Sequence, residues 1–529
     1  MLHKLKSFGL TWQLSITLIA LGAVMEPSEA KTLFWARSSD VQTLDPDAYN
    51  EGITHAFNVN IYDSLTAIDR DGKIIPGLAT EWRLLPNDPT VWEFKLRKGV
   101  TFHDGAPFTA DDVVFSFQRV TAPTSGLRSY FDDVVSVKAV DDYTVWIKSK
   151  NPNLPLINDI WAMWIMNRAW CEKHGTTAPQ DFKSKEDSYA STHENGTGPY
   201  RLVSREPDRR TELVAYEGYW GKKDAPLDVD RIVYTPIQAA ATRISALISG
   251  DVNFVQDVTP QDVPKLEVNP ALRVSKMPEA RTVFLGMNIG AKKLTHGQAD
   301  GNPFAHLRVR QAMDLAIDRK AIQSAIMRGL SIPSSTIQAS SLPSFTEALK
   351  TPTEPNIDEA KRLMSEAGYG NGFRVTLDCT NGGTVNDERI CQALVGMFAK
   401  IGIQVSLNVQ PPGIIWPEYT KKNTDFYLTT WGGATNDIPY LKNLVHSRGT
   451  WAAINYKDAR LDAEIDDLSS ITDQGKYVKM VSDVWEKVRK EKLYLPIHQQ
   501  VLVWATSSDI TPEINVSNRT FVRNFKLNR

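Results

Sequence analysis

The chain of 529 residues carries 60 Lys and Arg against 62 Asp and Glu, which gives a formal net charge of −2. Charges this evenly balanced leave no basic surface for nucleic acid or for an anionic membrane, so neither partner is expected. The length predicts two or three domains, because a single core rarely grows beyond about 300 residues. Three cysteines are too few for a disulfide scaffold, and they lack the paired spacing of a zinc site.

The first thirty residues predict a cleaved export signal. Lys4 and Lys6 precede an apolar run at 10–24, and Ser28-Glu29-Ala30 places small residues at the two positions that a signal peptidase reads. The apolar run is shorter than the ~20 residues of a membrane-spanning helix. We therefore expect cleavage before Lys31 rather than a membrane anchor. No cysteine follows the run to carry a lipid anchor.

The stretch 78–119 predicts a hairpin, a turn and a capped helix. Trp92, Phe94 and Leu96 alternate with charged residues after a turn at 86–89, as in a strand with one buried face. Thr109 can cap the helix that follows it by accepting a hydrogen bond from the Asp112 amide. These residue types do not form a catalytic pattern.

The remainder of the first half predicts strands that alternate with helices. We expect strands at 33–36, 135–139, 145–147, around 200–202, 232–234 and 283–288, and helices at 58–68, 154–166 and 239–248. The helix at 154–166 is apolar on nearly every side, so it is expected to be buried.

The second half predicts a further α/β unit. We expect helices at 307–317, 322–327, 358–367 and 387–400, two more between about 459 and 490, and strands at 373–377, 405–409, 426–428 and 495–504. The segments 373–377, 387–400 and 405–409 form a βαβ unit, in which two parallel strands are covered by their crossover helix.

Several short motifs occur in an order that resembles one known family. They are the stretch 78–119, LDP at 44–46, GTGPY at 196–200, RVRQA at 308–312, AIDR at 316–319, AGY at 367–369 and IGI at 401–403. Each motif is weak alone. Together they resemble, over nearly the whole mature chain, the periplasmic solute-binding proteins of peptide, opine and nickel ABC importers, which are family 5 of the extracellular solute-binding proteins.

This resemblance implies an α/β fold of two lobes, the periplasmic binding protein fold, with an extra subdomain inserted in the first lobe. The expected divisions are a signal peptide at 1–30, a first lobe of 31–60, 190–287 and 505–529, an inserted subdomain at 61–189, and a second lobe at 288–504. The hinges are then expected near Met287-Asn288 and Trp504-Ala505.

The implied function is that of a periplasmic receptor. A monomer of this kind closes its lobes on a small solute and delivers it to the membrane permease of an ABC importer. A di- or oligopeptide is the expected solute, while an opine or an oligosaccharide remain alternatives that the sequence does not separate. No histidine cluster suggests a direct nickel site, and neither a metal nor a cofactor is predicted.

An exported hydrolase is the alternative from another class. The sequence has no GxSxG, HExxH or GxxxxGK[ST] motif. His103 and Asp104 could be read as a base with its orienting carboxylate, but neighbouring residues of an extended chain point to opposite faces, so a structural turn is expected. Asp69 to Gly72 begins like a calcium loop, but the later ligands are missing. We therefore do not expect an enzyme.

Candidate ligand-binding residues lie at 430–440, in a loop after a strand, where ligand loops of α/β lobes commonly lie. Trp431 offers a stacking face, Gly432 permits close backbone approach, and Tyr440 ends the stretch. Asp437 can pair with a cation. In peptide-binding relatives an aspartate of the similar loop holds the ligand's amino terminus, so the resemblance gives Asp437 that role. The alternative is that Asp437 caps the next helix.

Two further aromatic residues are candidates. Trp416 follows the Pro-Pro-Gly segment at 411–413 and either reaches the cleft or packs in the interior. Tyr49, just after the LDP motif, occupies a position similar to that of a ligand-facing tyrosine in nickel-binding relatives. The alternative for Tyr49 is a surface aromatic.

Two of the three cysteines are placed for a disulfide. Cys379 ends a predicted strand, and Cys391 lies in the next helix, which packs back over that strand. An oxidising compartment permits the bond. The alternative is two buried free thiols. Cys171 has no partner nearby in the sequence and is expected to be free.

Overall fold

The computed structural model describes residues 30–528 apart from 183–185, 343 and 434–435. The predicted signal peptide, as far as residue 29, lies outside the described residues. Residues 31–529 form one compact unit. In the described part, no helix combines the length and the apolar character needed to cross a membrane.

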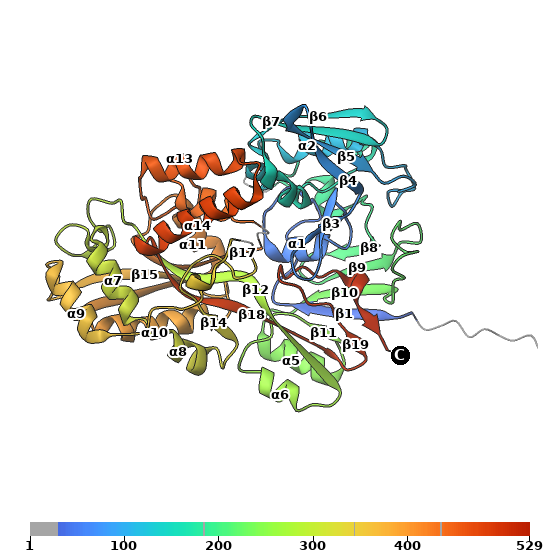
Figure 1. The fold of residues 1–529 in the computed structure, drawn as a ribbon. Helices are drawn as coiled ribbons and strands as arrows, with labels where there is room; N and C mark the ends of the chain where they lie inside the picture. The colour runs from blue at the N-terminus through green and yellow to red at the C-terminus, as the bar shows by residue number, and fades with distance from the viewer. Residues whose placement is uncertain (1–29, 183–185, 343, 434–435, 529) are drawn as a thin grey trace, which may run out of the picture. The chain divides into compact units, whose positions relative to one another are not determined.

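A mixed sheet of twelve strands runs through this unit (Figure 1). Its strands are β1 (Thr32–Arg37), β8 (Tyr200–Glu206), β9 (Arg210–Ala215), β10 (Arg231–Pro236), β11 (Phe254–Val255), β12 (Leu272–Met287), β13 (Gly297–Gln298), β14 (Ser331–Pro333), β15 (Phe373–Thr380), β16 (Ile403–Gln410), β17 (Phe426–Gly432) and β18 (Tyr494–Ser507). The order is β13-β15-β17-β12-β18-β11-β1-β10-β9-β8, with β14 beside β18 and β16 beside β15.

The long strands β12 and β18 pair antiparallel and connect two lobes. The end of β12 from Ala280 onward and the start of β18 as far as Ile497 belong to the core of the second lobe. Met277 on β12 and Leu502 on β18 pack instead in the core of the first lobe. The β12–β18 register shifts between Pro278 and Thr282, so the irregular point of the ladder lies where the chain passes between cores.

The first lobe is built around Trp35 of β1, which is fully buried. The rings of Phe57, Tyr234 and Phe254 surround it at centroid distances of 5.9, 5.0 and 5.7 Å. Its further elements are α1 (Gly52–Asn58), α5 (Ala240–Ser249), α6 (Val263–Glu267), β19 (Ile510–Thr511), η9 (Val522–Asn524) and β20 (Lys526–Leu527). Helix α5 ends at Gly250, whose φ of 86° favours glycine.

The inserted subdomain has its own four-stranded sheet, ordered β4-β5-β7-β6. Its elements are β2 (Thr66–Ile68), β3 (Ile74–Pro76), β4 (Ala79–Leu85), β5 (Asp88–Leu96), α2 (Ala110–Val120), η1 (Arg128–Phe131), β6 (Val134–Asp141), β7 (Thr144–Ser149), η2 (Leu154–Asn158), η3 (Ile160–Ala162) and α3 (Arg168–Lys173), and α4 (Tyr189–Thr192) lies at its boundary with the first lobe. The predicted hairpin is confirmed by the antiparallel pair β4–β5. Thr109 is the N-cap residue of α2, and its backbone N–H donates to Asp112 Oδ2 at 3.0 Å.

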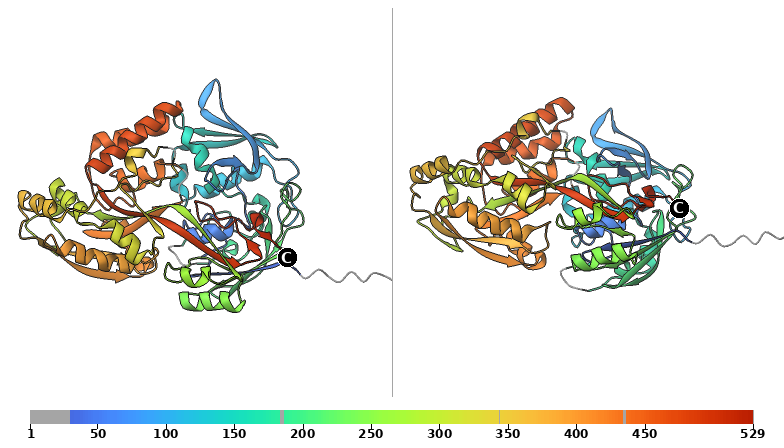
Figure 2. Two further views of the ribbon diagram at one scale, coloured as in Figure 1. Left: turned by 60° about the horizontal axis from the view of Figure 1, so that its bottom comes forward. Right: turned by 90° about the horizontal axis from the view of Figure 1, so that it is seen from below.

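The second lobe contains the predicted βαβ unit, in which β15 and β16 run parallel on either side of α10 in the chain. Figures 1 and 2 show α10 on one side of the strands and α13 with α14 on the other. Its helices are η4 (Pro303–Ala305), α7 (Leu307–Ala316), α8 (Arg319–Ala321), η5 (Ile322–Ile326), η6 (Glu347–Leu349), α9 (Ile357–Glu366), α10 (Asp387–Ala399), α11 (Pro412–Thr420), α12 (Ile438–Tyr440), η7 (Leu441–Val445), α13 (Ala459–Asp467), η8 (Leu468–Ser470) and α14 (Gln474–Lys490).

Two predicted helices are wrong. The helix expected at 58–68 lies earlier, as α1, because Glu51 caps its N-terminus and the chain turns after Asn58. The segment 154–166 forms two short 3₁₀ helices followed by extended chain. Its backbone bonds to neighbours instead: the Ile165 N–H donates to Asp63 O at 3.0 Å, and the Met166 N–H donates to Ser116 Oγ at 2.9 Å. The apolar pattern reflected burial on all sides rather than helical periodicity.

Candidate ligand-binding site

Three of the predicted aromatic residues gather in the second lobe around Trp451. The ring of Trp451 lies 6.4 Å from that of Trp416 and 6.2 Å from that of Trp431, both at steep interplanar angles. Trp431 also contacts Tyr440 at 6.2 Å. Tyr440 is fully buried and donates from its hydroxyl to Ala280 O at 3.3 Å, whereas Trp416 and Trp431 are only partly buried. Tyr440 therefore supports the cluster, and the two tryptophans retain exposed faces.

Gly432 lies at the end of β17, directly opposite Arg281 of β12. A Cβ atom at Gly432 would lie 2.6 Å from the Cβ of Arg281 and 2.9 Å from Ala280 O. A glycine is needed here because the two backbones approach closely beside a long side chain.

Arg281 is a charged residue of this region that the sequence reasoning missed. Its Nε donates to Glu279 Oε1 at 2.9 Å, and the buried Glu279 also accepts from Gln500 Nε2 at 2.7 Å. Its Nη2 faces the first lobe, 4.0 Å from the position that a Cβ at Gly52 would occupy. Two charges just before an apolar strand were the available signal, since such positions are unexpected in a buried strand.

The facing segment of the first lobe carries Tyr49 and Glu51. Glu51 accepts from the backbone N–H groups of Ile53 and Thr54, each at 2.8 Å, and so fixes the N-terminus of α1. Tyr49 is half-buried and stacks on Phe182 with ring centroids 4.5 Å apart. Tyr49 is thus separate from the aromatic cluster, but only three residues from the point where the first lobe approaches Arg281.

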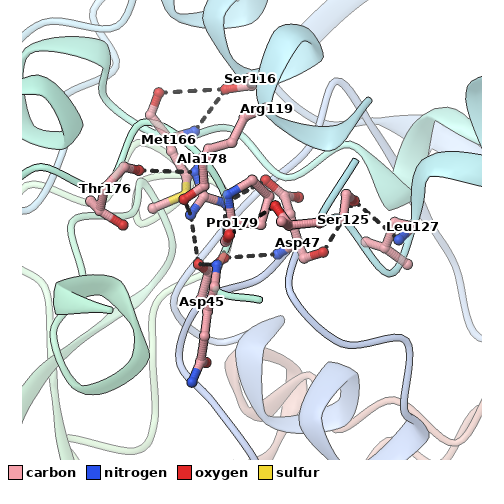
Figure 3. A network of polar contacts seen from close by, with 12 residues as sticks. Asp45, Asp47, Ser116, Arg119, Ser125, Leu127, Met166, Thr176, Ala178 and Pro179 are labelled. Carbon is pink, nitrogen blue, oxygen red and sulfur yellow. Dashed lines mark hydrogen bonds and ion pairs between the residues drawn. The ribbon is translucent and has the colours of Figure 1, made fainter. Parts of the chain in front are cut away.

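The LDP motif holds this segment in place (Figure 3). Arg119, fully buried on α2, donates to Asp45 at 2.6 and 2.8 Å and to Asp47 at 2.7 Å. Burial raises the pKa of Asp47 to about 7, although Arg119 opposes the shift. The Asp47 carbonyl also accepts from the Gly126 N–H at 3.0 Å. The motif therefore anchors the loop that leads to Tyr49 and is structural itself.

Asp437 does not cap the next helix, because its side chain makes no capping hydrogen bond. The carboxylate is 1% exposed and turns inward, where it accepts from Gln338 Nε2 at 2.7 Å, Ser344 Oγ at 2.6 Å and Trp485 Nε1 at 2.8 Å. Burial raises the pKa of Asp437. A ligand amine at this carboxylate would compete with three donors of the protein itself.

Polar contacts cross between the lobes next to this loop. Asn436 Nδ2 donates to Asp159 Oδ1 of the inserted subdomain at 3.0 Å, and Lys442 Nζ pairs with Asp133 at 2.8 Å. Asp159 is buried, and burial raises its pKa to about 7. Such contacts join residues hundreds of positions apart, and no local sequence pattern could have revealed them.

The histidine considered as a base has a structural role. His103 Nδ1 contacts Glu194 Oε2 at 2.6 Å and Nε2 contacts Gly198 O at 2.9 Å, so both ring nitrogens are occupied. Burial opposes a charged ring, but the Glu194 carboxylate outweighs it and raises the pKa of His103. The pair ties the stretch 78–119 to the GTGPY segment. Within the described residues, no group of three or more His, Cys, Asp or Glu is arranged to hold a metal ion.

Two α/β lobes share the long strands β12 and β18, and Arg281 of β12 approaches the first lobe at Gly52. This is the architecture of a two-lobed solute-binding protein. The family model of the bacterial extracellular solute-binding proteins, family 5, matches residues 73–451. The chain therefore belongs to this family. The receptors of the family deliver solutes to ABC importers.

Members of this family with known binding roles are similar to this chain over most of its length. The glutathione-binding protein GsiB of Pectobacterium atrosepticum is 25% identical over 496 residues, 91% of each chain. The dipeptide-binding protein of Escherichia coli K12 is 26% identical over 452 residues, 80% of this chain and 78% of its own. The structure of the periplasmic binding protein DppA from Helicobacter pylori, in complex with the peptide STSA, superposes with a TM-score of 0.80 at 23% identity. That match covers 94% of this chain and 98% of DppA.

Proposed function

We propose that this protein is a periplasmic receptor that captures a di- or oligopeptide between its lobes and presents it to the permease of an ABC importer. The observation that carries the proposal is the approach of Arg281 Nη2 to the first lobe, 4.0 Å from the position of a Cβ at Gly52 and three residues from Tyr49. The partly exposed Trp431 lies in the chain next to Gly432, the strand partner of Arg281. A guanidinium suits a peptide carboxylate, and an indole suits a side chain or the peptide plane. The similarity to glutathione-, dipeptide- and peptide-binding proteins supports the same class of solute.

The proposed site combines all six residues singled out in the sequence. Trp416 and Trp431 would offer stacking faces, Tyr49 would close the site from the first lobe, and Gly432 would let β17 approach the backbone at Arg281. Tyr440 and Asp437 would hold the loop, with Asp437 as the amine partner only if the ligand displaces one of its internal donors. An opine or oligosaccharide remains the alternative solute.

Capture would proceed by lobe closure in a monomer. The lobes divide as 31–60, 190–287 and 505–529 against 288–504, with the subdomain at 61–189 inserted in the first. The sequence places the hinges near Met287-Asn288 and Trp504-Ala505. The change of core along β12 and β18 favours slightly earlier hinges, near 277–282 and 497–502. A ligand that contacts both lobes binds the closed form better and shifts the population toward it.

Native mass spectrometry of protein purified from the periplasm of its source tests the proposal first, and a bound peptide mass is expected. Calorimetry with that peptide then compares wild type with Trp431→Ala, for which about tenfold weaker binding is expected from lost stacking. Val135→Ala is the control, because Val135 is exposed on the inserted sheet. A bound sugar or opine would contradict the peptide assignment, and unchanged affinity in Trp431→Ala would contradict the site.

A further inference from the structure

Arg519 is a buried cation without a counter-ion in the described part of the chain. It is 6% exposed, and its guanidinium lies 3.5 Å from the ring centroid of Trp161. Among the described residues, no carboxylate or hydrogen-bond acceptor pairs with its side chain. Burial lowers the pKa of Arg519 to about 9. A buried charge is costly unless it is paired, so this arrangement needs an explanation.

The other arginines buried to the same extent all have acceptors. Carboxylates pair with Arg37 (Asp257), Arg119 (Asp45 and Asp47) and Arg319 (Asp314), while backbone carbonyls accept from Arg243 (Ile237, Gln238 and Asp257) and Arg310 (Phe304, Ala305 and Glu491). Arg519 is therefore the exception among the buried arginines of the described residues, because the side chain of each of the others has at least one acceptor.

The titratable neighbours of Arg519 do not compensate its charge. Tyr130 and His55 are the groups that interact with it electrostatically. Burial raises the pKa of Tyr130, and burial lowers the pKa of His55 to about 3. Both are therefore neutral at neutral pH, and the guanidinium carries an unbalanced positive charge.

Arg519 lines a cavity of ≈ 200 Å³ between the first lobe and the inserted subdomain. Aromatic residues make up much of the wall, including Trp161, Trp164, Tyr219 and Trp220. The lining residues all lie at 59–77, 161–164, 219–225 and 519–524. None of these lining residues belongs to the second lobe, so the wall is formed by the first lobe and the inserted subdomain.

The buried carboxylate of the wall is already used. Asp63 pairs with Arg523 at 3.2 Å and accepts from Trp220 Nε1 at 2.9 Å and from Thr197 Oγ1 at 3.2 Å. The other acidic residue of the wall, Asp224, is exposed and does not interact with Arg519. The indole N–H groups of Trp161 and Trp164 also lack acceptors. The wall is thus rich in donors and lacks one negative charge.

We propose that this cavity is a binding site for a monocarboxylate with an apolar body, whose carboxylate pairs with Arg519 while its body contacts the aromatic wall. One uncompensated guanidinium calls for one negative charge, which a planar carboxylate matches in a bidentate pair. The aromatic wall favours an organic acid over an inorganic ion. The carboxylate belongs either to a separate small acid or to the end of a captured peptide, and the proposal does not depend on the peptide function.

Thermal unfolding and calorimetry with benzoate test the site, with benzamide as the neutral analogue. Benzoate is expected to raise the Tm of wild type by mass action, and benzamide to leave it unchanged. Arg519→Met should abolish the benzoate effect, or weaken binding at least about tenfold. Arg519→Lys should retain part of it. Arg519→Met is expected to fold, because it removes an unpaired buried charge.

A second pair of ligands separates the two sources of carboxylate. If the dipeptide Ala-Phe loses affinity on C-terminal amidation in wild type but not in Arg519→Met, the solute itself supplies the carboxylate. If amidation has the same effect in both proteins while benzoate still requires Arg519, a separate acid occupies the cavity. The proposed site would be overturned if neither the binding of benzoate nor the binding of the peptide depended on Arg519. Intact peptide binding in that variant would leave the proposed function standing.

Discussion

At the scale of single residues, substitutions of Asp437 show whether its carboxylate serves the fold or binds the ligand. Its carboxylate accepts hydrogen bonds from Gln338, Ser344 and Trp485, all buried. We expect Asp437→Ala to lower the free energy of unfolding by about 2–4 kcal/mol, because three buried donors lose their acceptor. Asp437→Asn should cost only about 1 kcal/mol, since one oxygen remains. Denaturant unfolding measures both variants.

The control is Ser344→Ala, which removes one donor and should cost no more than about 1 kcal/mol. A contrary result would be full stability of Asp437→Asn together with ~10²-fold weaker binding of an amine-bearing ligand. That combination would mean that the carboxylate serves the ligand rather than the fold.

Asp159 makes stability depend on pH near neutrality. Burial raises its pKa from 3.8 to about 7, with Asn436 and Lys442 opposing the shift. Between these two pH values the unfolded chain releases the proton while the folded chain keeps it, so stability is lost as the pH rises from about 4 to 7. We expect Asp159→Asn to be more stable than wild type by up to a few kcal/mol at pH 8 and equal to it near pH 4.

Denaturant midpoints at several pH values measure this difference. Asp47 also titrates near pH 7, so the comparison between the two proteins, rather than wild type alone, isolates Asp159. Asp71→Asn is the control, because Asp71 is exposed. Parallel stability profiles of wild type and Asp159→Asn would contradict a proton on Asp159.

At the scale of elements, the sequence predicted the helices and strands that depend on local patterns, but not the contacts between residues far apart in the chain. The β4–β5 hairpin, the Thr109 cap and the β15–α10–β16 unit each lie within one continuous stretch of fewer than 40 residues, so alternation, helical periodicity and capping residues reveal them. The opposition of Arg281 and Gly432 depends on the register of strands about 150 residues apart. No periodicity specifies that register, which explains why the charged half of the site was missed.

The segment 154–166 shows the opposite failure. Its residues Ile160, Met163 and Ile165 are fully buried, and a uniformly apolar run does not distinguish a buried helix from irregular chain enclosed by core. Tertiary hydrogen bonds to Asp63 and Ser116 decided the outcome.

The disulfide that links β15 to α10 can be tested by counting free thiols. In the structure Cys379 and Cys391 are joined as a disulfide, and Cys171 is free and buried. Titration of denatured, unreduced protein should therefore detect one thiol, and titration after reduction should detect three. Reduction should destabilise the fold by roughly 3 kcal/mol in the chain-entropy model for so short a loop. Three thiols before reduction would rule the bond out.

At the scale of the whole molecule, the proposed closure can be tested at an exposed ion pair between the inserted subdomain and the second lobe. The Lys442–Asp133 pair is about one-third exposed on both sides, so it contributes at most about 1 kcal/mol. Small-angle scattering with the solute identified by native mass spectrometry should give a smaller radius of gyration than scattering without it, because a ligand in the proposed site would contact both lobes and favour the closed form. An equal radius at saturation would contradict closure.

A charge reversal shows whether the inter-lobe contacts bias that equilibrium. Asp133→Arg places a second positive charge beside Lys442, so it should disfavour the closed form. The radius of gyration of the free protein should then increase, and solute binding should weaken by a few-fold, in proportion to the loss of the closed population. Asp71→Arg changes the net charge equally at an exposed position away from these contacts and should leave both quantities unchanged. High salt should reduce the effect of Asp133→Arg, because it screens exposed charges. If both variants enlarged the radius alike, net charge rather than this contact would set the balance between open and closed forms.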